Sequence, residues 1–312
     1  MAEPTQHALG DRAAFQLANV TKTPPQYSAI TPRWLVRLLD WKPLEAGTLR
    51  VNRVVNDDET VEVACGTKDE KALPEGYVDY EQKPREYTLC AITTVLDVHT
   101  RVSDLYSNPF SQIGEQLRLT IENVKERQES ELINNDEYGL LKNVAPAQRI
   151  KTRKGPPTPD DLDELLTKVW KEPSFFLAHP RAIAAFGREC TLRGAPPPTV
   201  TLFGSPFLTW RGVPIFPTEK LRIDGNAKPK AQGGKTNILL LRVGEKKQGV
   251  VGLFQPGLPG EQTPGLSVRF MGINTKAIAS YLISLYCSVA VLTDDAIGAL
   301  EDVEVGTYHD SK

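Results

Sequence analysis

The clearest alternation of apolar and polar positions lies just before the middle of the chain. Ile113, Leu117, Ile121 and Val124 recur at helical spacing, and charged side chains occupy the other faces. This spacing predicts one amphipathic helix over residues 110–135. With about 1.5 Å of rise per residue, the helix is about 35–40 Å long. That is long for a globular domain, although an ordinary surface helix on a large core would show the same pattern.

Two shorter helices are indicated by capping signals. Thr31 can cap a helix whose first turn contains Pro32, which predicts a helix ending at Asp40. Thr158 and Pro159 form a similar signal, and the acidic residues after them favour a helix N-terminus. The apolar stripe that this second helix should bury consists of Leu162, Leu165, Leu166, Val169 and Trp170.

The chain changes character after Pro173. A short helix is expected over residues 179–188, and short apolar runs separated by proline and glycine follow it. These runs predict strands in TVTLFG, FLTWRGVPIFP, NILLLRV, GVVGLFQ and LSVRFMGI. The second half of the chain is therefore predicted to mix α and β structure.

An uncharged stretch over residues 277–293 resembles a membrane span at first sight. It is shorter than a spanning helix requires, and three serines interrupt it. We therefore interpret it as a buried helix that runs into a buried strand. Asp294 and Asp295 follow, and we interpret them as capping groups for a helical AIGAL segment.

Two segments of the N-terminal part contain too little apolar surface to form a core. Residues 1–33 are punctuated by proline, which predicts an extended arm that reaches a neighbouring subunit, with a disordered tail as the alternative. Residues 48–64 show a hairpin pattern around an acidic turn, but most of their side chains are polar. We expect this hairpin to project and to pair with another part of the structure.

Composition narrows the function without defining it. The 312 residues include 37 basic and 39 acidic side chains, which gives no basic footprint for nucleic acid. None of the four cysteines (Cys65, Cys90, Cys190 and Cys287) belongs to a CxxC unit, and their number fits a reducing compartment. The first residues contain acids and no apolar core, so no secretory signal is expected. A cytoplasmic protein is predicted.

A search for catalytic chemistry finds no convincing motif. Gly233, Gly234, Lys235 and Thr236 resemble part of a phosphate loop, but Pro229 stands where that loop needs a glycine amide. No histidine pair has metal-ligand spacing, and no nucleophile motif is present. We therefore predict no catalytic, cofactor-binding or metal-binding residues and no cofactor. An enzyme with an unrecognised site stays open at this point.

The order of the elements resembles the subunit of tailed-phage capsids of the Hong Kong 97 type. The amino-acid sequence itself is similar to the A-type of family-two encapsulins over nearly the whole chain. Blocks that support this resemblance include ITPRWL, PREYTL, LDVHTRVSDLYS, KVWKEPSFFL and GVVGLFQPGLPGEQTPGLSVRFMGI. The resemblance implies an α+β fold of the Hong Kong 97 phage-capsid type, with an N-arm, an E-loop, a P-domain with a spine helix, and an A-domain.

The resemblance also implies a division of the chain. Residues 1–33 would be the N-terminal arm and residues 47–94 the E-loop. The P-domain would combine 34–46 with 95–175 and contain the spine helix 110–135. The A-domain would cover 176–285, and residues 286–312 would return to the P-domain.

The function implied by the resemblance is that of a non-enzymatic shell subunit. About 60 copies would assemble into a closed icosahedral shell in the cytoplasm. The shell would enclose a cargo enzyme, a cysteine desulfurase of sulfur metabolism, through docking residues that the sequence does not identify. No nucleic acid or membrane partner is expected. The alternative is a prophage major capsid protein that packages DNA.

A candidate pore loop follows the helix expected over 179–188. Gly194 permits a sharp turn, and Pro196 and the two prolines after it stiffen the return. Arg193, Gly194, Ala195 and Pro196 are the candidate residues. Repeated around a symmetry axis, Arg193 would form a cationic ring that attracts anions. A plain surface turn, with Arg193 paired to a local acid, is the alternative.

Overall fold

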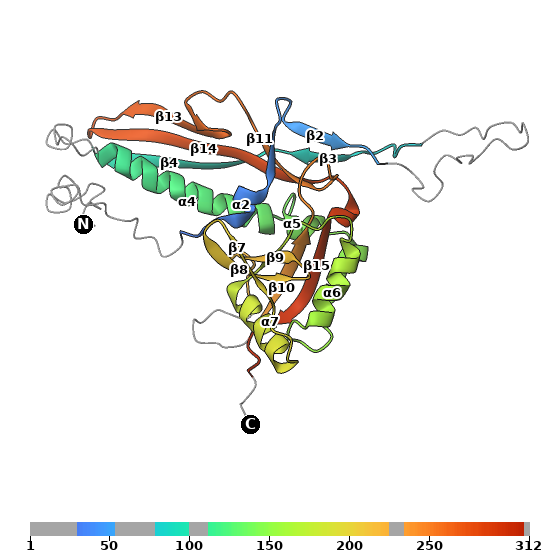
Figure 1. Cartoon of the computed structure of the whole chain (residues 1–312). Helices are drawn as coiled ribbons and strands as arrows, with labels where there is room; N and C mark the ends of the chain where they lie inside the picture. Colours follow the sequence, from blue (N-terminus) through green and yellow to red (C-terminus); the bar gives the residue numbers. More distant parts are fainter. Residues whose placement is uncertain (1–29, 54–78, 100–111, 225–233, 309–312) are drawn as a thin grey trace, which may run out of the picture.

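The computed structural model describes residues 30–53, 79–99, 112–224 and 234–308. Figure 1 shows two parts that meet at an angle. One is an elongated layer, in which a long helix lies along a sheet. The other is a compact body, in which a second sheet is packed between helices. The N-terminal segment that the structure describes enters where the two parts join.

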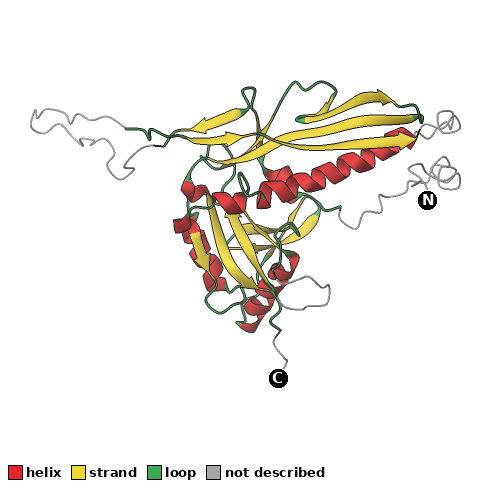
Figure 2. Cartoon of the chain, turned by 180° about the vertical axis from the view of Figure 1, so that it is seen from behind, coloured by secondary structure: helices red, strands yellow, loops and turns green. Residues whose placement is uncertain are grey.

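The elongated layer is built on a sheet of six strands. The sheet order is β1 (Asp40–Pro43), β11 (Val250–Phe254), β14 (Ile278–Val291), β13 (Leu266–Ile273) and β12 (Glu261–Thr263), and β4 (Cys90–His99) also pairs with β14. Helix α4 (Gln112–Asn134) runs along one face of this sheet (Figure 2). Its residues Leu117, Ile121 and Val124 pack against Ile283 and Leu285 of β14. The stripe predicted on the long helix is confirmed.

The compact body is built on a sheet of seven strands. Their order is β5 (Arg149–Lys151), β15 (Ile297–Glu304), β10 (Lys235–Leu241), β6 (Phe175–Ala178), β9 (Val213–Pro217), β8 (Ser205–Trp210) and β7 (Thr199–Leu202). Helices α6 (Pro159–Lys168) and α7 (Pro180–Leu192) cover one face. Short helices α2 (Trp34–Leu38) and α5 (Leu140–Asn143) and the end of α4 cover the other. Both faces of the central strands are therefore buried.

A two-stranded sheet and two short turns complete the structure. Strand β2 (Thr48–Val51) pairs with β3 (Arg85–Thr88), so the predicted hairpin strand at 48–51 finds its partner far along the chain. The turn and second strand that we predicted within 54–64 lie outside the described residues. The 3₁₀ turns are η1 (Pro146–Gln148) and η2 (Asp294–Ala296). Figure 1 shows the β2–β3 sheet at one end of the layer, where Leu49 and Tyr87 pack against β11 and β14.

The interpretation of residues 277–293 as a helix followed by a strand is wrong. Ile278–Val291 forms one strand, β14, which pairs with β4 on one side and with β13 and then β11 on the other. From Ile283 to Val291 the strand is buried on both faces apart from Tyr286, so this part has no alternating pattern and its apolar run resembles a buried helix. None of the helices in the described residues is long and apolar enough to cross a membrane.

Three local predictions also need correction. Helix α2 is shorter than predicted, and its N-cap is Arg33 rather than Thr31. The segment after Asp295 is strand β15 instead of a helix. Trp170, which was predicted on the buried stripe, is 70% exposed, because α6 ends at Lys168 before the ring can turn inward. The capping box at Thr158 and the burial of Leu162, Leu165 and Val169 agree with the prediction.

The predicted domain ranges do not follow the two sheets. The boundary between 285 and 286 falls inside β14, which is continuous in the layer. Strands β11 and β13 lie within the range 176–285 but belong to the layer. Strand β15 lies within 286–312 but belongs to the sheet of the compact body.

Candidate functional site: assembly surfaces and the pore loop

The described residues contain no cluster of metal ligands. Lys235 and Thr236 lie in strand β10, and Thr236 is buried, so the GGKT sequence does not form a phosphate loop. Burial raises the pKa of the Cys190 thiol to about 11 and that of Cys287 to about 12, which keeps both thiols protonated and unreactive.

A pair of acids joins three parts of the molecule. Asp294 accepts two hydrogen bonds from the Arg53 guanidinium, at 2.8 and 2.6 Å, and Arg85 lies 3.2 Å away. These arginines belong to the β2–β3 sheet or follow it directly. The neighbouring Asp295 points to the compact body, where Arg242 donates at 2.7 Å and Lys171 lies at 3.1 Å. We call this group the Asp294–Asp295 junction.

The electrostatics of the junction follow from its geometry. The Arg242 side chain is 3% exposed, so its charge needs a close partner. Burial by itself raises the pKa of Asp295, but hydrogen bonds from Arg242, Thr293 and Lys171 outweigh burial and hold the pKa well below its ordinary range. Sequence reasoning took both acids for helix caps, and nothing in the sequence links Asp294 to Arg53 across 241 positions.

A second polar group ties the N-terminal segment to the long helix. Glu126 of α4 accepts from the amide and hydroxyl of Thr31, at 2.8 and 2.9 Å. Lys220 of the compact body lies 2.9 Å from the same carboxylate. Arg33 donates at 2.6 Å to Glu122, one turn earlier on α4. Thr31 therefore anchors the entering segment through its amide and its hydroxyl instead of capping a helix.

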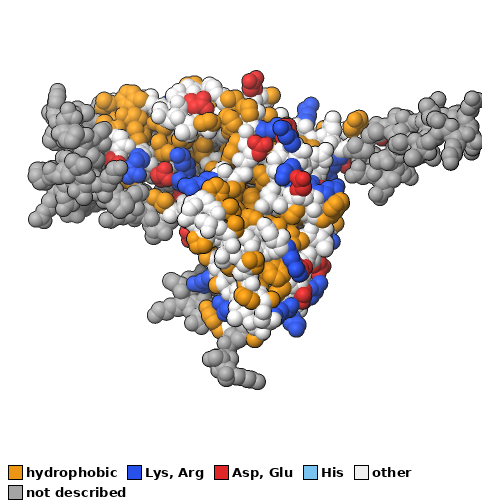
Figure 3. All heavy atoms as spheres, viewed as in Figure 1, with side chains coloured by type: hydrophobic (Ala, Val, Ile, Leu, Met, Phe, Trp, Pro, Cys, Tyr) orange, Lys and Arg blue, Asp and Glu red, His pale blue; other side chains and the backbone are white. Residues whose placement is uncertain are grey.

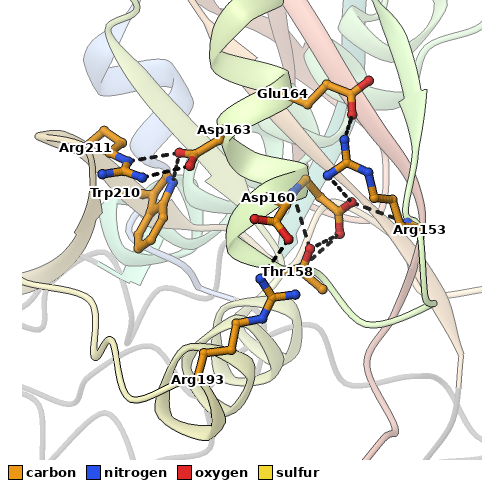
Figure 4. A network of polar contacts seen from close by, with 9 residues as sticks. Arg153, Thr158, Asp160, Asp163, Glu164, Arg193, Trp210 and Arg211 are labelled. Atoms are coloured by element: carbon orange, nitrogen blue, oxygen red, sulfur yellow. Dashed lines mark hydrogen bonds and ion pairs between the residues drawn. The ribbon is translucent and has the colours of Figure 1, made fainter.

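The candidate pore loop follows α7, and Figure 4 shows Arg193 pointing toward Asp160 of α6. Arg193 is the C-cap of α7, and Gly194 adopts a left-handed φ of 69°, as the predicted turn requires. Residues 193–196 are all exposed. The Arg193 guanidinium donates to Asp160 at the start of α6, at 2.8 Å. The structure thus places a local acid beside Arg193.

The remainder of Figure 4 belongs to the helix that carries Asp160. Thr158 and Asp161 cap the first turn reciprocally, and Asp163 accepts from Arg211 and from the indole of Trp210. The hydrogen bond from Arg211 holds the pKa of Asp163 below its ordinary value. These contacts fix α6 against the β8–β9 turn, so Asp160 is presented to Arg193 from a rigid element.

The largest exposed apolar side chains occur on both parts of the molecule. Val95, Phe270, Met271 and Ile273 lie on β4 and β13, in the elongated layer. The compact body exposes Trp170, Leu192 and Phe203. On β4 the exposed positions alternate, because only the face toward α4 is covered. A monomer gains nothing from such surfaces, whereas subunits of an assembly can bury them.

This architecture defines the class of protein. A long helix on an extended sheet, a compact body and a projecting two-stranded sheet form the fold of Hong Kong 97-type capsid subunits. A chain in the solved structure of Microbacterium phage Oxtober96 has a TM-score of 0.60 at 11% identity, over 93% of this chain and 98% of that chain. Likeness at that identity concerns the fold alone.

The family follows from closer similarity. The family model described as "Type 2A encapsulin shell protein SrpI-like" matches residues 48–307. The type 2A encapsulin shell protein SrpI of Synechococcus elongatus is 68% identical over 304 residues, which cover 97% of this chain and 96% of the relative. A type 2A encapsulin shell protein of Mycolicibacterium paratuberculosis is 61% identical over all of this chain and 99% of the relative. The chain belongs to this family.

A solved structure supports the same assignment. The holo-SrpI encapsulin complex of Synechococcus elongatus, determined by cryo-electron microscopy, contains a chain with a TM-score of 0.82 and 64% identity, covering 98% of this chain and 99% of that one. The family consists of structural shell proteins and not of enzymes, which confirms the prediction made from the sequence. The prophage capsid alternative is not favoured, because phage proteins match in fold only.

Proposed function

We propose that this chain forms an icosahedral shell of about 60 copies in the cytoplasm, held together by like contacts repeated around symmetry axes. Membership of a shell-protein family carries this proposal. Two features support it. Exposed apolar side chains on both parts can be buried between subunits, and a net charge of −2 causes little repulsion between identical subunits.

We assign the parts of the subunit accordingly. The elongated layer corresponds to the P-domain with α4 as its spine helix, the compact body to the A-domain, and the β2–β3 sheet to the base of the E-loop. Residues 1–33 form the N-terminal arm that crosses to a neighbouring subunit; of these, only 30–33 are described. Deleting residues 1–29 should lower the apparent melting temperature of the particles, and unchanged melting would contradict the assigned role.

The enclosed cargo is a cysteine desulfurase in this proposal. The resemblance of the sequence blocks to A-type family-two shells supports this pairing, and the similar Synechococcus elongatus shell was solved as a holo complex. In this proposal the enclosed enzyme catalyses the reaction, and the shell subunit does not. Pyridoxal phosphate would be bound by that enzyme, and the shell itself needs no cofactor.

Two expression experiments test the function. The chain expressed alone should give hollow particles by negative-stain electron microscopy, with no nucleic acid absorbance. A stable monomer in size-exclusion chromatography would contradict shell formation. Co-expression with a cysteine desulfurase should yield particles that contain the enzyme. At near-neutral pH these particles should show the absorbance of pyridoxal phosphate bound to that enzyme. Particles that stay empty while the enzyme is abundant would contradict the cargo assignment alone.

Arg193, Gly194, Ala195 and Pro196 remain the candidate pore loop. The ion pair with Asp160 lowers the net charge that Arg193 offers to a passing anion. Replacing Asp160 with Asn should therefore unmask the cationic ring and raise turnover of an enclosed enzyme with an anionic substrate, and Arg193→Gln should reduce it. Turnover is compared with that of the free enzyme at several salt concentrations. Equal turnover in all shells would show that residues 193–196 do not gate entry.

A further inference from the structure

Two cysteines lie directly opposite each other in the sheet of the elongated layer. In the antiparallel pairing of β4 with β14, Cys90 is the register partner of Cys287. Directly opposite side chains project from the same face of a sheet, with Cβ atoms about 4.5–5.5 Å apart. Cys287 packs against Val124 of α4, so both thiols lie on the face that α4 covers. Both thiols are free in this structure.

The backbone at this pair holds the two cysteines within reach of a disulfide. The amide of Tyr286 donates to the carbonyl of Gly265, on the β13 side of β14, at 2.9 Å. Because backbone groups alternate between the two sides of a strand, those of Cys287 face β4. Opposite residues that exchange both hydrogen bonds have Cα atoms about 5.5 Å apart, within the range of about 4.4–6.8 Å found in disulfides. The Cβ atoms lie at the upper end of the disulfide range or beyond it, so the bond would be strained and readily reduced.

The Tyr138 hydroxyl lies beside both sulfurs. It is buried, and it has no oxygen or nitrogen partner in the described part of the chain. Burial raises the pKa of Tyr138, and the nearby thiols of Cys287 and Cys90 raise it further, so the three groups lie together. A buried donor without a partner is costly, and an oxygen atom added to the Cys90 sulfur would accept its hydrogen bond. The hydroxyl is therefore suited to stabilise an oxidised sulfur.

The pair is accessible to small molecules only. Helix α4 lies over this face of the sheet, and Figure 3 shows Lys and Arg side chains gathered over that helix. An apolar pocket of about 420 Å³ opens between α2, α4 and the sheet, and Cys287 is among the residues that line it. A pocket of this volume admits a small solute.

The two thiols differ in how readily they can react. Cys90 is half-buried, whereas Cys287 is fully buried. Burial raises the pKa of Cys287 to about 12, so this thiol does not react with solutes by itself. Cys90 is therefore the sulfur that meets an oxidant first, and Cys287 is the sulfur held opposite it to resolve the product.

We infer that Cys90 and Cys287 form a reversible disulfide when a hydroperoxide reaches them, and that this bond staples β4 to β14. The Cys90 sulfur attacks the peroxide: an S–O bond forms, the O–O bond breaks, and the displaced oxygen leaves with the Cys90 proton as water or an alcohol. The Cys287 sulfur then attacks the Cys90 sulfur. An S–S bond forms, the S–O bond breaks, and the departing hydroxide takes the Cys287 proton as water. Two thiols are oxidised and one peroxide is reduced.

A peroxide titration of the assembled protein tests the inference. Purified particles of the full-length chain are treated with hydrogen peroxide, denatured, alkylated and digested without reduction. Mass spectrometry should find the peptides of Cys90 and Cys287 joined, with two hydrogen atoms fewer than the separate peptides. The number of titratable thiols per chain should fall by two, and glutathione should restore both without unfolding the particles.

The staple should also stabilise the subunit. It closes a loop that contains more than half of the chain, and closing a long loop restricts the unfolded state strongly. Oxidation should therefore raise the apparent melting temperature by about 5 °C. Cys90→Ser and Cys287→Ala should each abolish the joined peptide and this rise. Cys190→Ala is the matched control, because it removes a fully buried thiol from α7 of the compact body and should leave both unchanged.

Three results would overturn the inference. The first is conversion of Cys90 to a sulfinic acid with no joined peptide. The second is a disulfide that joins either cysteine to Cys65, which lies outside the described residues, or to another chain. The third is a joined peptide without any rise in melting temperature, which would show that the bond is no staple. The linked peptide is measured on the wild-type chain, so this result holds even where a variant folds poorly.

Discussion

The two sheets of this subunit are covered to very different degrees. In the compact body, Phe176 and Leu240 pack under α6 and α7 while Leu177 and Leu239 pack against α2, α4 and α5, and all four are fully buried. In the elongated layer, α4 covers one face only, and Val95 and Phe270 stay more than half exposed. The compact body is thus a complete core within one chain, whereas the layer leaves apolar side chains of one face exposed.

The largest expected effect is a difference in the free energy of unfolding between a core substitution in the compact body and one in the elongated layer. Phe176→Ala removes a fully buried ring from the compact body and should destabilise the chain by about 3–5 kcal/mol. Ile121→Ala, on a partly buried position of α4, should cost about 1–2 kcal/mol. Urea unfolding followed by tryptophan fluorescence at one protein concentration gives both values. Equal losses would mean that the layer is as completely packed as the body.

A similar loss is expected from the polar junction between the parts. Arg242→Met leaves Asp295 without its main partner in a partly buried place and should cost about 3 kcal/mol. The matched control is Arg211→Met, which removes an exposed arginine from its pair with Asp163 and should lower stability far less, because solvent screens that pair. The apparent melting temperature at neutral pH compares them, and a control that melts as early as Arg242→Met would refute the junction's importance.

The junction also predicts a pH dependence. The pKa of Asp295 is depressed in the folded chain, so its stabilising effect is complete above the unfolded pKa of about 3.9. It is lost as the pH falls through the folded pKa. The difference in melting temperature between wild type and Asp295→Asn should therefore be constant from pH 7 to about pH 5 and shrink below about pH 4. A difference that shrinks between pH 7 and 5 would contradict this assignment.

A smaller, local effect is expected at the base of the β2–β3 sheet. Asp294→Asn removes the ion pairs with Arg53 and Arg85, which are partly exposed and stabilise the whole chain by about 1 kcal/mol or less. The same change should speed hydrogen exchange in β2 and β3, because the junction fixes that sheet to the compact body. Glu86→Gln, which breaks only the exposed pair with Arg50, should leave exchange unchanged.

The smallest expected effect has the opposite sign. Burial against the compact body raises the pKa of Glu129, despite a hydrogen bond from Thr218 at 3.0 Å. Its ionised form is therefore costly in the folded chain, and that cost is absent below the unfolded pKa of about 4.3. Glu129→Gln should raise the apparent melting temperature slightly at pH 7 and have no effect near pH 4. A lower melting temperature at pH 7 would show that the charge is needed.

The same difference in coverage explains what the sequence predicted. Helix α4 buries one face against the sheet, so the apolar stripe of Leu117, Ile121 and Val124 could be predicted from the sequence, and it is confirmed. Strand β14 is covered more evenly and has no such period, and it was taken for a helix. Family resemblance supplied the fold class, but the domain limits, which depend on strand pairing between distant segments, did not follow the sheets.

The candidate sites were predictable only in part. The turn at Gly194 has the left-handed backbone that its residue type indicated. Whether Arg193 faces open space or an acid depends on how α6 packs against α7, and local spacing carries no information about that. The Asp294–Asp295 junction was missed for the same reason, since its partners Arg53 and Arg242 lie 241 and 53 positions away along the chain.

The pairing of strand β14 limits where insertions and deletions can be tolerated as the sequence evolves. Along its fourteen residues it holds a register with β4, β13 and β11 at once. One inserted or deleted residue would turn every following side chain to the opposite face and misalign three partners together. Descendants of this sequence should therefore accumulate insertions and deletions in connecting loops, while the span from 278 to 291 keeps its length even where its residues drift.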